Sequence, residues 1–264
     1  MHIILKQKDN KSIKKFEKEI CNYNYESIFN KILNLFFPPA CGICGKLNND
    51  WICSKCFKSI EDKVKANIIK TASYAEIENI GDKQEIKKEL SENYKDNVYV
   101  SEIMYLFKYE GKIREMIIDY KFNEKSYIYI TFVKILLKSK KMLENIKNYD
   151  TIIPVPISEK RYKKRGYNQS YLLAKEICKY ANLNLEENCL YKIKDNVEQS
   201  SLSGFERQEN IKGAYELKNM QILNNKKILL LDDVYTTGAT VNECARILSK
   251  AKPRKIGVFI LAKD

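Results

Sequence analysis

The sequence predicts an α/β protein with an open, mainly parallel sheet flanked by helices, preceded by a small zinc-binding module. Two observations predict the sheet. From residue 98 onward, short stretches of β-forming residues alternate with helical periodicity, and residues 227–231 form a continuous apolar run. A strand that is apolar on both faces is typical of a parallel sheet buried between helix layers. The third observation is a group of four closely spaced cysteines before this region, which predicts the zinc-binding module.

Four segments follow one another along the chain. We expect an N-terminal extension at residues 1–27, a zinc-binding module at 28–62, a charged linker or surface excursion at 63–97, and the α/β domain at 98–264. The module opens with a short amphipathic helix at 28–37, which Pro38 and Pro39 end because proline cannot continue a helix.

The α/β domain reads as strands and helices in alternation, which is the pattern of βαβ units. Residues 98–109 favour a strand, Gly111 breaks it, and apolar residues from Ile113 to Tyr120 recur at helical spacing. The remaining elements are a helix at 127–143, a strand at 151–156, a helix at 168–181 with Asn168 as its N-cap, a strand at 227–231, a helix at 240–250 and a strand at 255–262.

Composition and charge limit the class of protein and its partners. The 264 residues are 44% hydrophobic and 31% charged, which excludes collagen-like, low-complexity and wholly disordered chains. The formal net charge of +13 invites an anionic partner, but the excess is mostly dispersed lysine, which coding bias also produces. No apolar run approaches the roughly 20 residues of a membrane helix. We therefore expect a cytoplasmic protein without membrane insertion, whose cysteines are reduced thiols.

Two C-x-x-C pairs predict a metal site. Cys41 and Cys44 form one pair, Cys53 and Cys56 the other, and eight residues separate the pairs. Each pair can bend so that both sulfurs face one point, and four thiolates in a tetrahedron are what structural zinc prefers. A closed shell leaves no position for substrate, so we expect the zinc to be structural. A redox dithiol is the minor alternative.

An acidic and threonine-rich loop follows the apolar run at 227–231. Asp232 and Asp233 are expected at the carboxyl edge of the sheet, where open α/β folds bind ligands. The turn into the next helix can cradle an anion with backbone N–H groups and threonine hydroxyls; it consists of Thr236, Thr237, Gly238, Ala239 and Thr240. Acids beside a phosphate cradle fit the hydroxyls of a ribose 5-phosphate or a hydrated Mg²⁺. A plain βα turn with an incidental acid pair is the alternative.

This loop resembles the phosphoribosyl-pyrophosphate (PRPP) motif of type I phosphoribosyltransferases, which has an apolar run, two acids and a Thr-x-Gly turn. Further stretches resemble the ComF (competence protein F) family: Pro154-Val-Pro156 with residues 161–169, residues 199–215, and a four-cysteine module after Phe-Pro-Pro. The resemblance covers about residues 28–60 and 98–264. One departure is Lys121-Phe-Asn-Glu124, where ComF-like chains usually have Lys-Phe/Tyr-x-Gly.

The resemblance implies roles for these residues. Asp232 and Asp233 would be the catalytic acids that hold the ribose hydroxyls, directly or through Mg²⁺, and residues 236–240 would hold the 5′-phosphate. The pyrophosphate would meet Pro156, Arg161 and Arg165, because residues 160–165 carry five positive charges. A solvated basic face is the alternative for this run.

Other polar residues leave their roles open. We expect Lys121 to face solvent more than substrate, and Glu206, Arg207 and Asn210 to form either a polar site or a salt-bridge network. The single histidine, His2, lies at the chain terminus and is not expected to be a catalytic base.

The sequence therefore predicts a ComF-family, phosphoribosyltransferase-like protein that binds PRPP with Mg²⁺ and carries structural zinc. The family implies a role in competence and DNA uptake, with single-stranded DNA or a competence helicase as partners. A PRPP- or nucleotide-sensing accessory protein without turnover is the alternative. A nucleobase salvage transferase is disfavoured, because such enzymes usually lack both the zinc module and the segment at 161–169.

Overall fold

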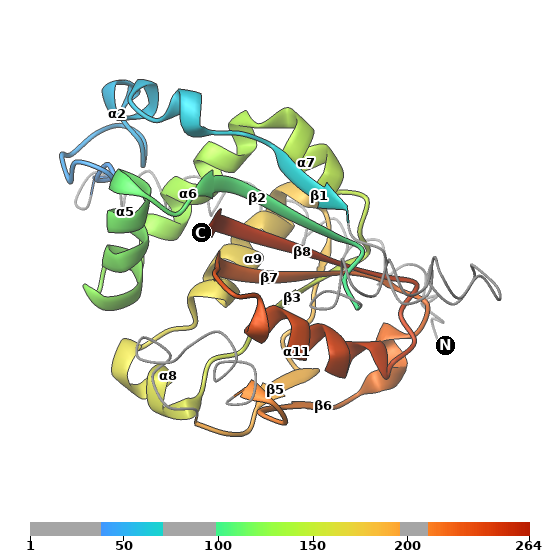
Figure 1. The fold of residues 1–264 in the computed structure, drawn as a ribbon. Helices are drawn as coiled ribbons and strands as arrows, with labels where there is room; N and C mark the ends of the chain where they lie inside the picture. The colour runs from blue at the N-terminus through green and yellow to red at the C-terminus, as the bar shows by residue number, and fades with distance from the viewer. Residues whose placement is uncertain (1–37, 71–98, 196–210) are drawn as a thin grey trace, which may run out of the picture.

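A six-stranded sheet runs through the centre of the molecule in the order β1-β2-β8-β7-β3-β4 (Figure 1). The computed structural model describes residues 38–70, 99–195 and 211–264. The strands are β1 (Asn67–Lys70), β2 (Glu102–Lys108), β3 (Thr151–Pro154), β4 (Asn184–Leu185), β7 (Lys227–Tyr235) and β8 (Lys255–Lys263). β1 pairs antiparallel with β2, and all other neighbours are parallel. The predicted open, mainly parallel α/β sheet is confirmed.

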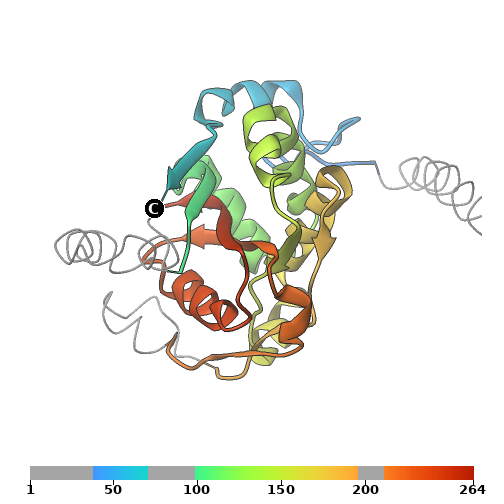
Figure 2. The same ribbon diagram turned by 90° about the vertical axis from the view of Figure 1, so that its right-hand side faces the viewer.

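Helices cover both faces of the sheet (Figure 2). The helices that pack on the sheet include α5 (Gly111–Phe122), α6 (Ile128–Lys138), α7 (Lys140–Ile146), α9 (Gln169–Ala181) and α11 (Ala239–Ser249). In β7, Leu229 and Leu231 pack in the core formed with α5, α6, α7 and α9, whereas Ile228 and Leu230 pack in the core formed with α11. Because side chains alternate along a strand, both faces of β7 are buried, which explains the continuous apolar run.

Shorter elements complete the described chain. They are α2 (Ser54–Lys58), η1 (Glu61–Lys63), α8 (Glu159–Arg165), η3 (Met220–Leu223) and an antiparallel pair formed by β5 (Leu190–Lys192) and β6 (Tyr215–Leu217). Leu190 and Tyr215 share the α11 core, so this hairpin flanks the α11 side of the sheet. The sequence did not predict the hairpin.

Three elements differ from the sequence predictions. The helix predicted over 127–143 is two helices, because Ser139 leaves the helical conformation with φ −91° and ψ 82°. The strand predicted over 227–231 continues to Tyr235, so Asp232 and Asp233 are strand residues and not loop residues. Residues 63–97 were predicted to be a linker or surface excursion, but Asn67–Lys70 near their start forms strand β1 and pairs with β2.

The cysteine-containing segment packs directly on α6. Thr131 of α6 donates a hydrogen bond from Oγ1 to the carbonyl of Trp51 (2.6 Å). Gly42 lies so close to Thr131 that a Cβ at this position would clash with its hydroxyl. Ile60 belongs to the same apolar core as Phe132. The segment and the α/β domain are therefore joined by shared core packing as well as by the chain.

Some predictions fall outside the described residues. They are the extension at 1–27, the helix at 28–37, most of the 63–97 stretch, and Glu206, Arg207 and Asn210. Within the described ranges, none of the helices combines the length and the apolar character that a membrane crossing requires.

Candidate active site at the carboxyl edge of the sheet

The first acid of the pair, Asp232, is held by hydrogen bonds near the end of β7. Its Oδ1 accepts from Ser170 Oγ of α9 (3.1 Å) and from the backbone N–H of Asp233 (2.9 Å). Burial, and after it the negative charge of Asp233, raises the pKa of Asp232 to about 7, although the Lys121 ammonium opposes the rise. Asp232 can therefore gain or lose a proton near neutral pH.

The second acid, Asp233, is buried with only one of its oxygens paired. The residue is 3% exposed, and its Oδ1 lies 2.8 Å from Lys121 Nζ. Its Oδ2 is buried and has no hydrogen-bond partner among the residues that the structure describes. An unsatisfied buried carboxylate oxygen is costly, so it indicates a position that a ligand completes. The prediction that Lys121 faces solvent is wrong, because its side chain is only 19% exposed and pairs with Asp233.

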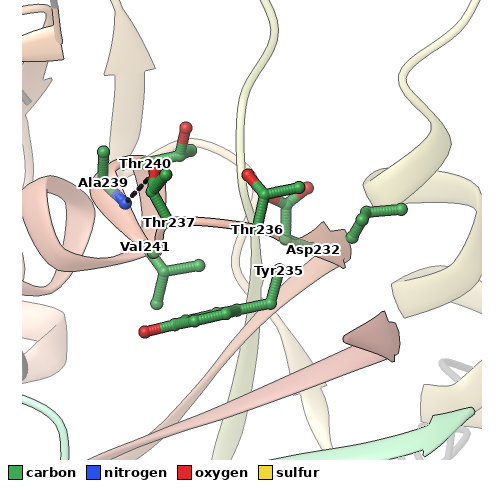
Figure 3. Close-up of a pocket in the computed structure, with 9 residues that line it drawn as sticks. Asp232, Tyr235, Thr236, Thr237, Ala239, Thr240 and Val241 are labelled. Atoms are coloured by element: carbon green, nitrogen blue, oxygen red, sulfur yellow. Dashed lines mark hydrogen bonds between the residues drawn. The ribbon is translucent and has the colours of Figure 1, made fainter. Parts of the chain in front are cut away.

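The turn from β7 into α11 depends on a glycine. Gly238 adopts φ +76° and precedes the first helical residue, Ala239, whose N–H is directed to Thr237 Oγ1 (3.4 Å; Figure 3). A Cβ on Gly238 would also clash with the phenol of Tyr235. Glycine is therefore required here for two independent reasons, backbone conformation and close packing.

A hollow forms over this turn (Figure 3). It is lined by Asp232 and by residues 234–241, which include all five residues of the predicted phosphate cradle. The first N–H groups of α11 have no acceptor within the helix and carry its positive dipole end. Together with the hydroxyls of Thr236, Thr237 and Thr240, these groups can hold a phosphate. The structure thus brings the predicted cradle and Asp232 into one hollow.

The basic run at 160–165 forms α8, with its arginines partly buried and its lysines outside. Arg161 and Arg165 are half-buried and share one face, since residues four apart are neighbours on a helix. The exposed lysines are Lys160, Lys163 and Lys164. Lys163 pairs with Glu159 in an exposed ion pair (2.6 Å). The lysines thus form a solvated face of α8. The two arginines lie on its partly buried side, from which they can contact a ligand.

Arg165 is fixed between α5 and α9. Its guanidinium donates a hydrogen bond to the side-chain oxygen of Gln169 and lies 5.4 Å from the centroid of the Phe122 ring. Burial lowers the pKa of Arg165, and the charge of Asp233 opposes this effect. The Arg165 guanidinium is therefore held close enough to the acid pair for the charge of Asp233 to affect it.

β5 contributes a cation that the sequence did not single out. Lys192 is half-buried, and its ammonium lies 5.4 Å from the centroid of the Tyr215 ring. Burial, and after it the positive charge of Arg161, lowers the pKa of Lys192. Among the described residues no salt bridge pairs either cation with an acid. The negative charges of Asp232 and Asp195 act in the opposite direction on the pKa of Lys192. Two cations without a close acidic partner can attract an anionic ligand.

The loop that follows β3 is tied to the start of α9. Asn168 donates from Nδ2 to the carbonyl of Val155 (3.1 Å), and its Oδ1 accepts from the backbone N–H groups of Ser170 (2.9 Å) and Tyr171 (3.4 Å). The predicted N-cap is confirmed. Pro156, the third residue predicted to meet pyrophosphate, is half-buried two residues beyond the end of β3.

The four clustered cysteines meet as the spacing predicts. The sulfurs of Cys41, Cys44, Cys53 and Cys56 all lie within 4.8 Å of one another. A tetrahedral zinc with Zn–S bonds of about 2.3 Å places its sulfurs about 3.8 Å apart, so a small contraction closes the shell. Backbone N–H groups of Cys53 and Cys56 are directed to the sulfurs of Cys41 (3.5 Å) and Cys53 (3.4 Å). This donor set fits structural zinc.

Comparison with known proteins shows similarity to a domain family and to several named proteins. A model of the phosphoribosyl transferase domain matches residues 169–264. Competence protein F of Haemophilus influenzae is 31% identical over 148 residues, which cover 54% of this chain and 65% of that protein. Competence protein ComFC of Streptococcus pneumoniae is 30% identical over 158 residues, which cover 60% and 66%. DNA utilization protein YhgH of Escherichia coli K12 is 26% identical over 158 residues, which cover 59% and 69%. The chain spans about two thirds of the length of these relatives.

Proposed function

This chain is a homologue of the competence protein F, ComFC and YhgH proteins and carries a phosphoribosyl transferase domain, and we propose that it binds PRPP at the carboxyl edge of its sheet. The observation that carries the proposal is the hollow that Asp232 shares with the glycine turn at Gly238, next to the neighbouring acid Asp233, whose Oδ2 has no hydrogen-bond partner among the described residues. A phosphorylated sugar supplies both a hydroxyl for the acid and a phosphate for the turn.

Each part of the sugar has a proposed partner. The backbone N–H groups and hydroxyls of residues 236–240 bind the 5′-phosphate, and Asp232 and Asp233 receive the ribose hydroxyls. Arg161, Arg165 and the loop at Pro156 bind the pyrophosphate, whose charge arginine matches well. Lys192 adds a further positive charge to the same region.

Transfer of the phosphoribosyl group to an acceptor is the proposed reaction. The bond from the anomeric carbon to pyrophosphate breaks, and a bond from that carbon to the acceptor nucleophile forms. Positive charge develops on the sugar in the transition state, so carboxylates beneath it and cations around the leaving group act electrostatically. Mg²⁺ bound to the pyrophosphate oxygens would neutralise charge on the leaving group.

The names of the relatives point to DNA and not to a salvage reaction. We therefore propose a cytoplasmic role in competence and DNA uptake, with single-stranded DNA or a competence helicase as the partner. A second candidate function is that PRPP or a nucleotide is bound and sensed without turnover. Both candidates use the same binding site, and they differ in whether pyrophosphate is released.

Incubation with PRPP, Mg²⁺ and a panel of nucleobases and amines separates these candidates. Release of pyrophosphate that depends on one acceptor supports a transferase, with the acceptor-free mixture as the control. Binding of PRPP in a calorimeter without acceptor-dependent release supports the sensing role. Absence of PRPP binding contradicts both candidates.

A further inference from the structure

Lys121 forms an ion pair that crosses from α5 to the acid pair on β7. Its Nζ lies 2.8 Å from Asp233 Oδ1, and the two side chains are 19% and 5% exposed. The residues are more than one hundred positions apart in the chain, and Lys121 lies outside the matched transferase domain at 169–264. The charge of Asp233 is therefore balanced by an element that precedes that domain.

Two tyrosines hold the end of α5 in place. Tyr120 donates from Oη to the carbonyl of Gln169 (2.7 Å), and its ring stacks on Tyr167 at 5.8 Å with an interplanar angle of 28°. Tyr167 in turn donates from Oη to the carbonyl of Tyr120. The backbone next to Lys121 is thus fixed to the start of α9, which limits the positions that the ammonium can reach.

The Lys121–Asp233 pair differs from the other ion pair at the same helix end. Lys125 lies 2.7 Å from Asp119, and their side chains are 44% and 32% exposed, so solvent can satisfy the remaining atoms. In the buried pair, Asp233 Oδ2 is shielded from solvent and finds no partner within residues 38–70, 99–195 and 211–264. An ion pair with a purely structural role would be expected to satisfy both oxygens, because leaving one bare in the interior is costly.

We propose that Lys121 is a positioning residue, which holds Asp233 by one oxygen and thereby leaves the other to accept a hydrogen bond from a hydroxyl of the bound sugar phosphate. The inference rests on the proposed sugar-phosphate site. Lys121 supplies the positive charge that a buried carboxylate needs, so the free oxygen can accept a hydrogen bond while the acid stays ionised. The orientation of the Asp233 carboxylate is set by the fixed end of α5, which holds the Lys121 ammonium in place.

The test compares two ligands, ribose 5-phosphate and inorganic phosphate, by calorimetry in magnesium-free buffer without a chelator, so that the cysteine-bound zinc stays in place. Lys121→Met is expected to weaken the affinity for ribose 5-phosphate by about tenfold or more. The affinity for inorganic phosphate, which is bound only at residues 236–240, is expected to change by less than about twofold. The matched control is Lys125→Met, which removes the exposed pair on the same helix end and is expected to leave both affinities unchanged. If Lys121→Met does not fold, Lys121→Gln replaces it with the same expectation.

A double-mutant cycle tests whether Lys121 acts through Asp233. In an Asp233→Asn background, adding Lys121→Met is expected to change ribose 5-phosphate affinity by less than about twofold, because the group that Lys121 positions is already altered. A further tenfold loss would overturn the inference, as would wild-type affinity in Lys121→Met. If the wild type binds neither PRPP nor ribose 5-phosphate, the proposed function itself fails.

Discussion

The cysteine cluster and the carboxyl edge of the sheet differ in whether their polar side-chain atoms have partners. The four sulfurs converge on one point, and backbone N–H groups are directed to two of them. At the sheet edge, Asp233 Oδ2 is buried with no partner in the described part of the chain, and burial disfavours the ionised form of Asp232. A group that is closed on itself fits a structural role, whereas groups left unsatisfied fit a site that awaits a ligand.

Removal of the metal tests the structural side of this comparison and has the largest expected effect. Cys41→Ser, or chelation, is expected to release about one zinc per chain and to destabilise the protein by several kcal/mol, because metal binding free energy is folding free energy. Metal analysis and thermal melting measure both effects. Cys178→Ser, which alters a half-buried cysteine outside the cluster, is the control. A folded, metal-free protein as purified would refute the zinc assignment.

Gly238→Ala tests the close packing at the phosphate turn. The left-handed backbone and the clash with Tyr235 together are expected to lower the free energy of unfolding by roughly 2–3 kcal/mol and to weaken phosphate binding. Gly111→Ala is the control, because Gly111 also has positive φ (+50°) but has open space around its Cβ position. Equal destabilisation in the two variants, with phosphate affinity retained, would contradict the role of Gly238 in shaping the turn.

Asp232→Asn tests whether the site stores unfavourable charge. The pKa of Asp232 is raised to about 7 in the folded protein, so between about pH 4 and 7 the folded state binds more protons than the unfolded state. The free energy of unfolding of the wild type therefore falls as pH rises through this window. Above pH 7 the ligand-free variant is expected to have a free energy of unfolding higher than that of the wild type by roughly 4 kcal/mol, and near pH 4 the two are expected to match. A difference that does not grow between pH 4 and 7 would be incompatible with a raised pKa.

Glu124→Gly has the smallest expected effect. Glu124 adopts φ +55° at the position where the resembling family usually has glycine. Relief of the left-handed strain is expected to outweigh the extra entropy of glycine in the unfolded chain, with a net gain of about 0.5 kcal/mol. Asn182→Gly is the comparison, since Asn182 has φ +54° but asparagine tolerates this conformation. A larger gain at Asn182 than at Glu124 would contradict this account.

Local sequence patterns predicted the elements whose signals are local. The apolar period of α5, the N-cap at Asn168 and the buried run of β7 each lie within a few neighbouring residues. The break at Ser139 was missed because apolar residues continue on both sides of it and no proline or glycine marks it. The end of β7 was also misplaced, since two aspartates resemble a loop unless their buried surroundings are known.

The site could be predicted only in part for the same reason. Asp232, Asp233 and the turn at 236–240 are contiguous, so their chemistry is visible in one short motif. Lys121 and Lys192 reach the site from α5 and β5, and nothing adjacent to either lysine indicates an acid or an arginine so distant in the chain. The one sequence feature that marked Lys121 was its match to the Lys-Phe/Tyr-x-Gly element of the ComF-like chains. That match does not show that Lys121 pairs with Asp233, because the pairing depends on the fold.

Calorimetric titration of Mg·PRPP into wild type and Asp233→Asn tests the central claim most directly. The variant keeps the size of the side chain but loses the charge that pairs with Lys121 and receives the sugar hydroxyl. We expect the wild type to bind and the variant to lose about a hundredfold in affinity, while Asp119→Asn, an exposed acid on α5, binds like the wild type. Unchanged affinity in Asp233→Asn would contradict the assignment of the sheet edge as the PRPP site.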